Sequence, residues 1–569
     1  MQTVPMTTAS RAEAIAAMSD PQGLDVLVIG GGITGAGAAL DAVTRGLRVG
    51  IVEAEDWSDG TSSRSSKLVH GGLRYLQMLD FTLVHEALTE RDLMLKEIAP
   101  HLVKPVGFVF PLRHRIWQRM YIGAGIMLYD ILASLSPSGR AMPWHRHFTR
   151  RGMKKRLPSI KTGAAIGGIQ YWDASVDDSR WVLNVLRTAV QHGAFAASRV
   201  RVQELLKDGE IVVGARVLDR LTDRTFDIHA KHVISATGVW TEETQSMATD
   251  EGGLRVLASK GVHIVVPRSR IQGDVGTILE TDKSVLFIIP WSRYWIIGTT
   301  DTPWTGNRRF PAANAADIQY VLDQANRIVS PPLNRDDILG VFAGLRPLLQ
   351  PNTDVRSSAK VSREHTALSP MPGLTVIAGG KLTTYRVMAR DAVDFALRGD
   401  VSAQPSVTDR VPLLGAQDLS TARSRLLLAQ QTFGWSNMMV DHLLHRYGSM
   451  VTELLAAIGA QADLAKPLAA APAYLRAEIH YAATHEGVVH LSDLMQYRTR
   501  LVYELKDGGI AALDEIISII APVLGWSRDR CEREVSAYSA WHRAIIQAGE
   551  APDDASAEAL LCSAVANLG

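Results

Sequence analysis

The chain has 569 residues, of which 46% are hydrophobic and 21% are charged, and its net charge at pH 7 is +1. This length exceeds one simple core and predicts two or three domains, and the near-neutral charge gives no reason to expect a nucleic-acid partner. Only two cysteines occur, Cys531 and Cys562, which excludes a disulfide framework, a Cys-x-x-Cys relay and a cysteine-ligated iron–sulfur cluster.

The same composition predicts a reducing, cytoplasmic setting. The first twenty residues lack the apolar run of a secretory signal, so residues 1–22 are interpreted as an N-terminal extension. No stretch of 18 apolar residues is free of charge, and no transmembrane helix is predicted.

A dinucleotide-binding unit is predicted near the N-terminus. Its glycines have the G-x-G-x-x-G spacing, which allows a tight turn, close approach to a pyrophosphate and close packing of helix on strand. The helix N-terminus that follows attracts phosphate, and the acid after the second strand accepts hydrogen bonds from a ribose. In chain order the parts are a strand at residues 25–29, Gly30, Gly32 and Gly35, a helix at residues 34–45, a strand at residues 47–52, and Glu53.

A hydroxyl-rich loop follows this unit. Residues 61–67, Thr-Ser-Ser-Arg-Ser-Ser-Lys, carry five hydroxyl groups and two cations, and Gly71 and Gly72 come soon after. This composition suits a loop that wraps a dinucleotide, with hydroxyls and amides on phosphate and the glycine backbone against a flat ring. The alternative is a solvated loop that leads into a helix.

This loop also carries a family resemblance. Ser62 to Leu76, Ser-Ser-Arg-Ser-Ser-Lys-Leu-Val-His-Gly-Gly-Leu-Arg-Tyr-Leu, resembles the signature of the FAD-dependent, quinone-linked glycerol-3-phosphate dehydrogenases. The resemblance covers roughly residues 20–540. Its other motifs are Val233-Ile-Ser-Ala-Thr-Gly238, Lys260-Gly-Val-His263, Ile297-Gly-Thr-Thr-Asp301, Gly344-Leu-Arg-Pro347, Ser362-Arg-Glu-His365 and Gly379-Gly-Lys-Leu-Thr-Thr-Tyr-Arg386.

Two segments between residues 81 and 172 suggest contact with a lipid surface. After a helix at residues 81–98 and an extended segment at 105–111, residues 116–135 are apolar but interrupted by Arg119 and Asp130. This segment either dips into a membrane interface or forms a buried helix. Residues 144–156 hold six Lys or Arg and no acid, so they either lie on anionic lipid or form a solvated loop.

The chain then returns to the predicted dinucleotide sheet. A strand at residues 166–172, a helix at 179–191 and a small antiparallel meander at 200–206, 211–218 and 225–228 precede the strand and glycine turn at 233–238. No second G-x-G-x-x-G follows a strand anywhere in the chain. A pyridine-nucleotide reductase needs a second such site, so we do not expect electron exchange with NAD(P).

The substrate side is predicted between residues 255 and 400. Runs at residues 262–266, 285–290 and 294–298 predict an antiparallel sheet over the flavin, and a strand at 373–380 precedes a helix at 382–397 whose N-terminus faces the flavin pyrimidine. The isolated Lys and Arg residues of this region would either bind a dianionic phosphate or form ion pairs at the surface. The resemblance implies that the substrate is surrounded by Arg74, Tyr75, Arg346, Arg363 and Lys381. His263 is either a core histidine or, by the same resemblance, an active-site residue.

The motif and the resemblance together predict FAD as the cofactor and no metal. The predicted FAD-binding residues are Gly30, Gly32, Gly35, Glu53, Ser62, Ser63, Ser65, Lys67, His70, Gly71, Gly72, Leu73, Thr237, Gly238, Gly380, Lys381, Leu382 and Thr383.

The C-terminal part is predicted to be helical. A proline-containing linker at residues 401–415 leads into it, and residues after about 545, rich in Ala, Asp and Glu, are expected to be loosely ordered. His480, His485 and His490 are spaced by five and do not share a helix face, so they predict no metal site. This domain either braces the flavin domain or makes a homodimer contact.

The predicted fold class is α/β: a two-part FAD-binding Rossmann-type domain interleaved with an antiparallel-sheet substrate domain, plus a C-terminal all-α domain. The predicted boundaries are residues 1–22 (extension), 23–110 (FAD-binding), 111–172 (cap and membrane contact), 173–255 (FAD-binding), 256–350 (substrate sheet), 351–400 (FAD-binding) and 401–569 (helical).

The predicted reaction is oxidation of sn-glycerol 3-phosphate to dihydroxyacetone phosphate. Hydride passes from C2 to flavin N5, Arg74, Arg346 and Arg363 bind the phosphate, and His263 or Lys381 accepts the hydroxyl proton. The resemblance further implies a membrane quinone as acceptor and a place at the inner face of the cytoplasmic membrane. Two alternatives are a flavin oxidase of amino or hydroxy acids, which needs one arginine for a carboxylate, and a flavin-bearing membrane scaffold without turnover.

Overall fold

A parallel sheet carries the predicted dinucleotide unit. The computed structural model describes residues 3–114, 116–137, 139–249, 253–281, 285–350, 365–400 and 402–566. Its first sheet has β1 (Leu24–Ile29) between β2 (Val49–Val52) and β10 (Arg224–Ser235), with all three strands parallel. β7 (Phe195–Ala197) extends the sheet beside β2, and β18 (Leu374–Gly379) and then β17 (His365–Met371) extend it beside β10. The predicted α/β fold with a Rossmann-type unit is confirmed.

The two faces of this sheet are covered differently. Alternate residues such as Val26, Val28 and Ile51 pack against helices, and Leu27 and Val233 on the other face pack against a meander of strands. The helices are α2 (Ile33–Thr44), α6 (Asp178–Gln191) and α9 (Tyr385–Ala396), the meander strands are β8 (Val200–Asp208) and β9 (Ile211–Asp219), and α1 (Thr8–Met18) adds Met18 to the meander side.

One strand serves both the meander and the parallel sheet. Residues 225–228 and 233–238 were predicted as separate strands, but β10 runs through both. Its first half pairs antiparallel with β9 and its second half pairs parallel with β1. Because the intervening His-Ala-Lys-His contains no turn residue, the strand continues without a break.

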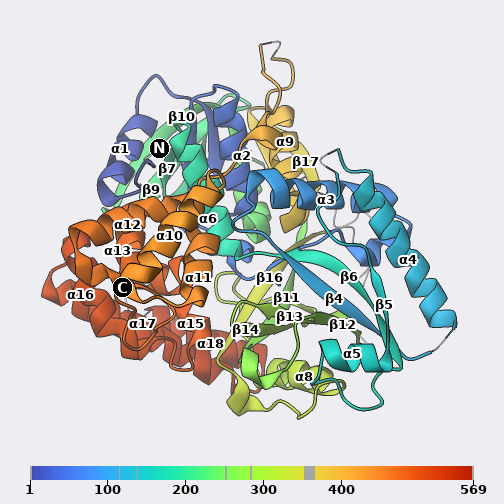
Figure 1. Ribbon diagram of the computed structural model, residues 1–569. Coiled ribbons are helices and arrows are strands. Elements are labelled where there is room, and N and C mark those ends of the chain that lie inside the picture. The colour runs from blue at the N-terminus through green and yellow to red at the C-terminus, as the bar shows by residue number, and fades with distance from the viewer. Residues whose placement is uncertain are drawn as a thin grey trace.

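The second sheet is mostly antiparallel and lies beside the first (Figure 1). Strands β11, β13 and β14 confirm the three predicted runs. The sheet also takes in β4 and β6 from outside the predicted 256–350 range, because β4 pairs with both β6 and β12. Its strands are β3 (Leu68–Val69), β4 (Lys104–Leu112), β5 (Arg146–Thr149), β6 (Gly167–Ser175), β11 (Val256–Pro267), β12 (Gly276–Glu280), β13 (Val285–Trp291), β14 (Tyr294–Gly298), β15 (Thr302–Pro303) and β16 (Gly340–Leu349).

Helices cover this second sheet. α8 (Ala315–Asn326) packs Ile318 and Val321 on one face, against Ile264 and Trp295. Tyr129 and Ile126 of α4 (Trp117–Ser134) belong to the core on the other face, together with Ile296. The remaining helices before residue 400 are α3 (Phe81–Leu93), α5 (Arg150–Arg156) and α7 (Thr241–Ser246).

α4 is not the buried helix that one of the two sequence interpretations expected. Gly123, Ile126 and Tyr129 are buried, but the opposite face of the helix exposes Trp117 and Met120 to solvent. The helix therefore has an apolar face that nothing in the described structure covers. In Figure 1 it lies at the right edge of the molecule.

The C-terminal part is helical, as predicted, and forms the orange and red region of Figure 1. The expectation that residues after about 545 are loosely ordered is wrong: two helices occupy them, and Ala557 and Leu561 pack against Ala312. An Ala-rich helix can pack closely because its side chains are small, which composition alone does not reveal. The helices are α10 (Leu419–Phe433), α11 (Asn437–Tyr447), α12 (Val451–Ala460), α13 (Arg476–His485), α14 (Leu491–Asp493), α15 (Leu501–Glu504), α16 (Leu513–Leu524), α17 (Arg528–Ala548) and α18 (Asp554–Ala566).

Candidate active site

A cavity of about 1020 Å³ opens at the carboxyl ends of β1, β2, β10 and β18, where ligands bind in open α/β sheets. Ten of the predicted cofactor residues line it. They are Gly30, Gly32, Glu53, Ser62, Ser65, Thr237, Gly238, Gly380, Lys381 and Leu382.

The three motif glycines each have a geometric reason. Gly30 has φ +109°, and a Cβ added there would lie 2.7 Å from the Ala236 carbonyl oxygen. A Cβ on Gly35 would lie 1.9 Å from the Gly30 carbonyl oxygen, so only glycine lets α2 pack so close to the turn. Gly32 is the N-cap of α2 and offers no side-chain cap.

Ser62 supplies the missing cap from the hydroxyl-rich loop. Its Oγ accepts a hydrogen bond from the Ile33 N–H at 3.0 Å, at the N-terminus of α2. The helix end and the Ser62 hydroxyl therefore both face the cavity, in the arrangement that binds a pyrophosphate.

Glu53 is held by backbone amides. Its two oxygens accept from Gly31 N at 2.6 Å and Glu55 N at 2.8 Å. Burial raises the pKa of the carboxyl to about 7, because the loss of hydration outweighs the two hydrogen bonds. The two hydrogen bonds therefore do not fully stabilise the charged form of the Glu53 carboxyl, and a ribose hydroxyl would supply a further hydrogen-bond donor to it.

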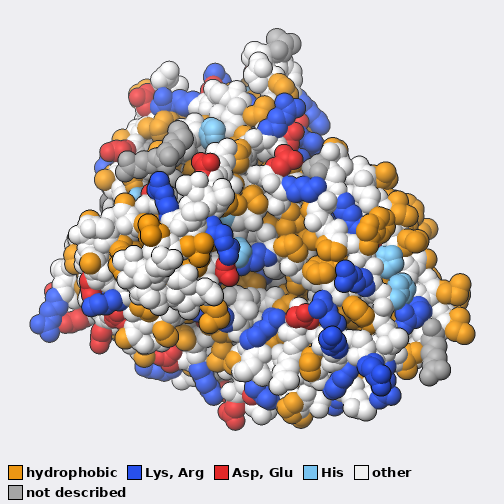
Figure 2. Space-filling view, viewed as in Figure 1, with side chains coloured by type: hydrophobic (Ala, Val, Ile, Leu, Met, Phe, Trp, Pro, Cys, Tyr) orange, Lys and Arg blue, Asp and Glu red, His pale blue; other side chains and the backbone are white. Residues whose placement is uncertain are grey.

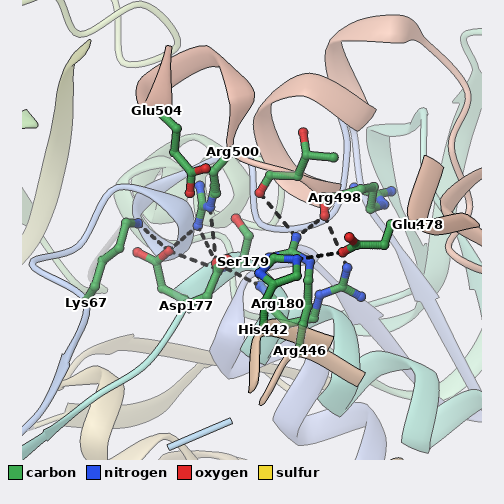
Figure 3. A network of polar contacts seen from close by, with 12 residues as sticks. Lys67, Asp177, Ser179, Arg180, His442, Arg446, Glu478, Arg498, Arg500 and Glu504 are labelled. Atoms are coloured by element: carbon green, nitrogen blue, oxygen red, sulfur yellow. Dashed lines mark hydrogen bonds and ion pairs between the residues drawn. The ribbon is translucent and has the colours of Figure 1, made fainter. Parts of the chain in front are cut away.

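Lys67, at the end of the polar loop, does not line the cavity. The Lys67 ammonium, which was predicted to contact the cofactor, donates to Asp178 at 2.6 Å and to the Ser63 carbonyl at 3.1 Å. Figure 3 shows Lys67 within this polar network. Burial and the charge of Arg500 lower its pKa to about 8, against the effect of Asp178. Asp178 also accepts from the Ser65 hydroxyl at 2.7 Å. Lys67 thus fixes the conformation of the loop through Asp178 and the Ser63 carbonyl.

Gly71 of the loop is positioned by α4 and β6. The Gly71 N–H donates to the Tyr129 hydroxyl at 2.8 Å, and this hydroxyl donates to Asp173 at 2.6 Å. Gly72 has φ +74° and begins the 3-10 turn Leu73–Met78. The neighbouring His70 is tied to Thr383, whose hydroxyl accepts from His70 N and donates to His70 O.

On the substrate side, Arg346 is fixed by three polar partners. Its guanidinium bonds to Asp301 at 3.3 Å, to the Thr299 hydroxyl at 3.0 Å and to the Thr300 carbonyl at 3.3 Å. Asp301 in turn accepts from the Ser259 hydroxyl. Arg346 stands on β16 opposite Ser259 on β11, so the sheet register sets its position.

His263 is buried close to Arg346. Its Nε2 lies 2.8 Å from the Ser66 hydroxyl, and its ring stacks on Phe342 with centroids 4.9 Å apart. Burial, and then the positive charges of Arg346 and Lys67, hold its pKa well below the ordinary value, so the imidazole is neutral at neutral pH. Its Nδ1 has no hydrogen-bond partner among the described residues.

The other predicted substrate residues are placed in part. The Lys381 ammonium lies 3.8 Å from the centroid of the Tyr75 ring. The backbone of Arg74 lies in the 3-10 turn Leu73–Met78, and Arg363 falls outside the described residues.

Sequence reasoning missed four residues that position this site. Asp301 and Thr299 stand in a motif that was noticed without a role for either, so a signal existed. Tyr129 and Asp173 contact the Gly71 amide although they lie 58 and 102 residues away in the sequence, and no sequence pattern predicts these two contacts.

The arrangement fits a flavin dinucleotide. A cradle of backbone N–H groups, a capped helix end and the buried Glu53 carboxyl line the cavity together with Gly380 and Lys381. Within the described part of the chain no group of three or more His, Cys, Asp or Glu side chains is placed to hold a metal ion.

Comparisons with known proteins point the same way. The profile of the FAD dependent oxidoreductase family matches residues 25–386, and that of the C-terminal domain of alpha-glycerophosphate oxidase matches residues 406–531. A glycerol-3-phosphate dehydrogenase of Mycobacterium leprae is 47% identical over 541 residues, covering 95% of this chain and 92% of the relative. The mitochondrial glycerol-3-phosphate dehydrogenase of Bos taurus is 35% identical over 551 residues, covering 92% and 74% respectively.

A solved structure agrees. The glycerol-3-phosphate dehydrogenase of Bacillus halodurans, complexed with FAD, superposes with a TM-score of 0.73 at 29% identity, covering 92% of this chain and 95% of that one.

Proposed function

Because the chain belongs to the FAD-dependent glycerol-3-phosphate dehydrogenase family, we propose that it oxidises sn-glycerol 3-phosphate to dihydroxyacetone phosphate. The observation that carries the proposal is the pairing of a fixed guanidinium, Arg346, with a neutral imidazole, His263, on adjacent strands. The first suits a phosphate and the second suits a proton acceptor.

When bound along the residues that line the cavity, FAD would supply the two-electron acceptor for the hydride of C2. Arg346 binds the substrate phosphate, with Arg74 and Arg363 as its predicted partners. Tyr75 and Lys381 flank the substrate. Because Asp301 and Thr299 hold the Arg346 fork, the phosphate arrives in one orientation.

His263 takes the proton of the C2 hydroxyl. A base must be neutral before it acts, and the burial of His263 beside Arg346 ensures this. When the dianionic phosphate binds, it opposes the charge of Arg346 and raises the imidazole pKa towards the range in which it can hold the proton. Lys381 is the other candidate base. The two are separated by measuring kcat against pH for the parent and for His263→Gln, which should lower kcat by about 10²–10⁴-fold if His263 is the base.

We assign the electrons to a membrane quinone on the strength of the exposed face of α4. Trp117, Met120 and Leu135 are 75%, 67% and 65% exposed. Figure 2 shows hydrophobic side chains gathered over this helix and Lys and Arg side chains gathered below it over α5. A contiguous exposed apolar patch on a monomer marks an interaction site.

The basic segment is held beside that face. Asp130 of α4 accepts hydrogen bonds from His145 N and Nδ1, both at 2.8 Å, just before the cations of β5 and α5. Apolar and basic surfaces side by side suit the anionic inner face of the cytoplasmic membrane. None of the helices in the described ranges is long and apolar enough to cross a bilayer.

The acceptor would meet the cofactor loop there. Met78, Leu79 and Phe81 are exposed apolar residues a few positions after Gly72 and Tyr75. A quinone that arrives from the bilayer would therefore dock next to the segment predicted to face the flavin. A homodimer, the other partner expected from the sequence, stays a prediction.

Addition of glycerol 3-phosphate to the anaerobic, FAD-loaded protein tests the reaction. We expect the yellow absorbance to bleach and a quinone to restore it. Bleaching only by an amino or hydroxy acid would indicate the oxidase alternative, and no bleaching by any of them would leave the scaffold. Arg346→Ala should raise KM for glycerol 3-phosphate sharply, whereas Arg216→Ala, on the exposed meander, should not. An unchanged KM would remove Arg346 from the phosphate site.

A further inference from the structure

The loop between β15 and α8 forms one wall of the cofactor cavity. Residues 305–310 all line it. The loop forms two ion pairs with segments that follow strands of the dinucleotide sheet: Arg309 with Glu55, after β2, at 2.9 Å, and Arg308 with Glu243, in α7, at 3.4 Å. Glu55 follows Glu53 by two residues, so the loop closes the end of the cavity at which the ribose acid stands.

The last helix, α18, holds this loop in place. Glu558 accepts a hydrogen bond from the Asn307 N–H at 2.9 Å. A Cβ added to Gly306 would lie 1.9 Å from the other Glu558 oxygen, so the carboxylate rests directly on the glycine backbone. The absence of a side chain at Gly306 is what lets the helix approach.

A second anchor lies at the other end of the loop. Asp554, at the start of α18, accepts from the Asn314 amide at 2.7 Å and pairs with the buried Lys260. Lys260 also donates to the Ala312 carbonyl at 3.2 Å and pairs with Asp317 at 2.5 Å. α18 therefore fixes both the 306–307 and the 312–314 parts of the loop.

The apolar contacts of α18 are few and local. Ala557 and Leu561 pack with Ala312, Ala544 and Ala548 in a small cluster apart from the main cores. Loss of an α18 contact should therefore change the position of the loop more than it lowers the stability of the fold. Both matched family profiles also end before α18, at residues 386 and 531.

We propose that Glu558 and Asp554 are positioning residues for the cofactor. Through them α18 acts as a strap that holds the 304–314 loop over the adenosine end of FAD and slows its release. The ribose acid Glu53 and residues 305–310 of the loop line the same cavity, so the strap limits escape of the adenosine half while leaving the flavin half to the substrate.

The strap is tested by FAD release from the full-length holoprotein. The appearance of free FAD fluorescence after dilution gives the dissociation rate. We expect Glu558→Ala to raise this rate about tenfold, the effect of losing one charged hydrogen bond. Glu558→Gln keeps an acceptor for Asn307 N–H and should release FAD more slowly than Glu558→Ala. Glu550→Ala is the matched control, because Glu550 pairs with Arg335 at the surface.

Trypsin cleavage and a second variant complement the measurement of FAD release. Trypsin should cut after Arg308 or Arg309 faster in flavin-free Glu558→Ala than in the flavin-free parent. If Glu558→Ala does not fold, Gly306→Ala displaces the same carboxylate and should raise the release rate. Unchanged release in Glu558→Ala and Asp554→Ala, or an equal increase in Glu550→Ala, would overturn the proposal.

Discussion

The seam between the dinucleotide sheet and the C-terminal helices is charged and buried, whereas the outer face of α4 is apolar and exposed. In the seam Arg180 pairs with Glu486, Arg498 with Asp56, and Arg500 with Asp178. Arg500 also pairs with Asp177, and both are labelled in Figure 3. On α4 large apolar side chains meet solvent. Each region reverses the usual distribution of side chains, and each reversal has a different cause.

Buried charges persist in the seam because they are paired. Burial alone would raise the pKa of Asp177, but Arg500 and Arg446 hold it well below its ordinary value. Asp178 connects this network to Ser65 and Lys67 of the cofactor loop. Among the described residues nothing covers the exposed side chains of α4. We therefore expect the seam to stabilise the fold and, under our proposal, the α4 face to bind a membrane surface.

The largest expected effect is on the seam. Arg500→Ala leaves Asp177 without its main cation and Asp178 with Lys67 alone, and the loss of one partner of a buried ion pair typically costs about 3–5 kcal/mol. Urea unfolding of the FAD-free protein should show this loss, and Arg500→Lys should recover part of it. Because the pKa of Asp177 is lowered by folding, its contribution is full above the unfolded value, near pH 4, and should decline progressively as pH falls from there towards the lower pKa of the folded protein.

A surface pair gives the contrast. Arg423 and Asp441 lie 3.5 Å apart with both side chains about half exposed. Arg423→Ala should cost less than about 1 kcal/mol, because solvent screens such pairs. Equal effects of Arg423→Ala and Arg500→Ala would remove the distinction between the seam and the surface.

The α4 face should matter for binding and not for folding. Trp117→Ser combined with Met120→Ser removes two exposed apolar side chains and should weaken co-sedimentation with anionic vesicles about 100-fold. The urea midpoint should stay the same, because neither side chain contributes to a core. A matched change on the buried face, Ile126→Ala, should do the opposite: it should lower stability by about 2–5 kcal/mol and spare vesicle binding in the folded fraction.

The basic segment beside α4 sharpens this result. Arg150→Ala with Arg151→Ala removes two exposed cations and should weaken binding to anionic vesicles about 30-fold, at about 1 kcal/mol per charge. Raising the salt concentration should remove most of the difference between the parent and this variant. Binding to neutral vesicles should not change, and a loss there would argue against an electrostatic role.

The sequence predicted what is local. The Gly30–Glu53 unit was predicted in full because its strand, glycines, helix and acid are contiguous. What joins distant segments was not predicted: the Tyr129 hydroxyl on the Gly71 amide, the seam arginines at residues 498 and 500, and Glu558 on the Asn307 amide. Each is a single side chain whose partner depends on how two units pack. The ion pair of Lys67 was missed for the same reason, since Asp178 lies 111 residues away, and the cofactor contact of Lys67 stays a prediction.

Glu53 provides the smallest expected effect. It is a buried carboxyl like those of the seam, but it is held by backbone amides, and its pKa is raised to about 7. A raised pKa means that the folded, FAD-free protein keeps a proton that the unfolded chain loses, so stability should fall as pH rises from about 4.5 to 7. Ribose hydroxyls donate best to the charged form, so FAD affinity should rise about tenfold between pH 6 and 8. Titration of deflavinated protein at both pH values measures this, and Glu53→Gln should abolish the slope. An FAD affinity that does not change with pH in the parent protein would mean that the Glu53 carboxyl is charged at both pH values, as the seam carboxyls are. Its hydrogen bonds would then outweigh the effect of its burial.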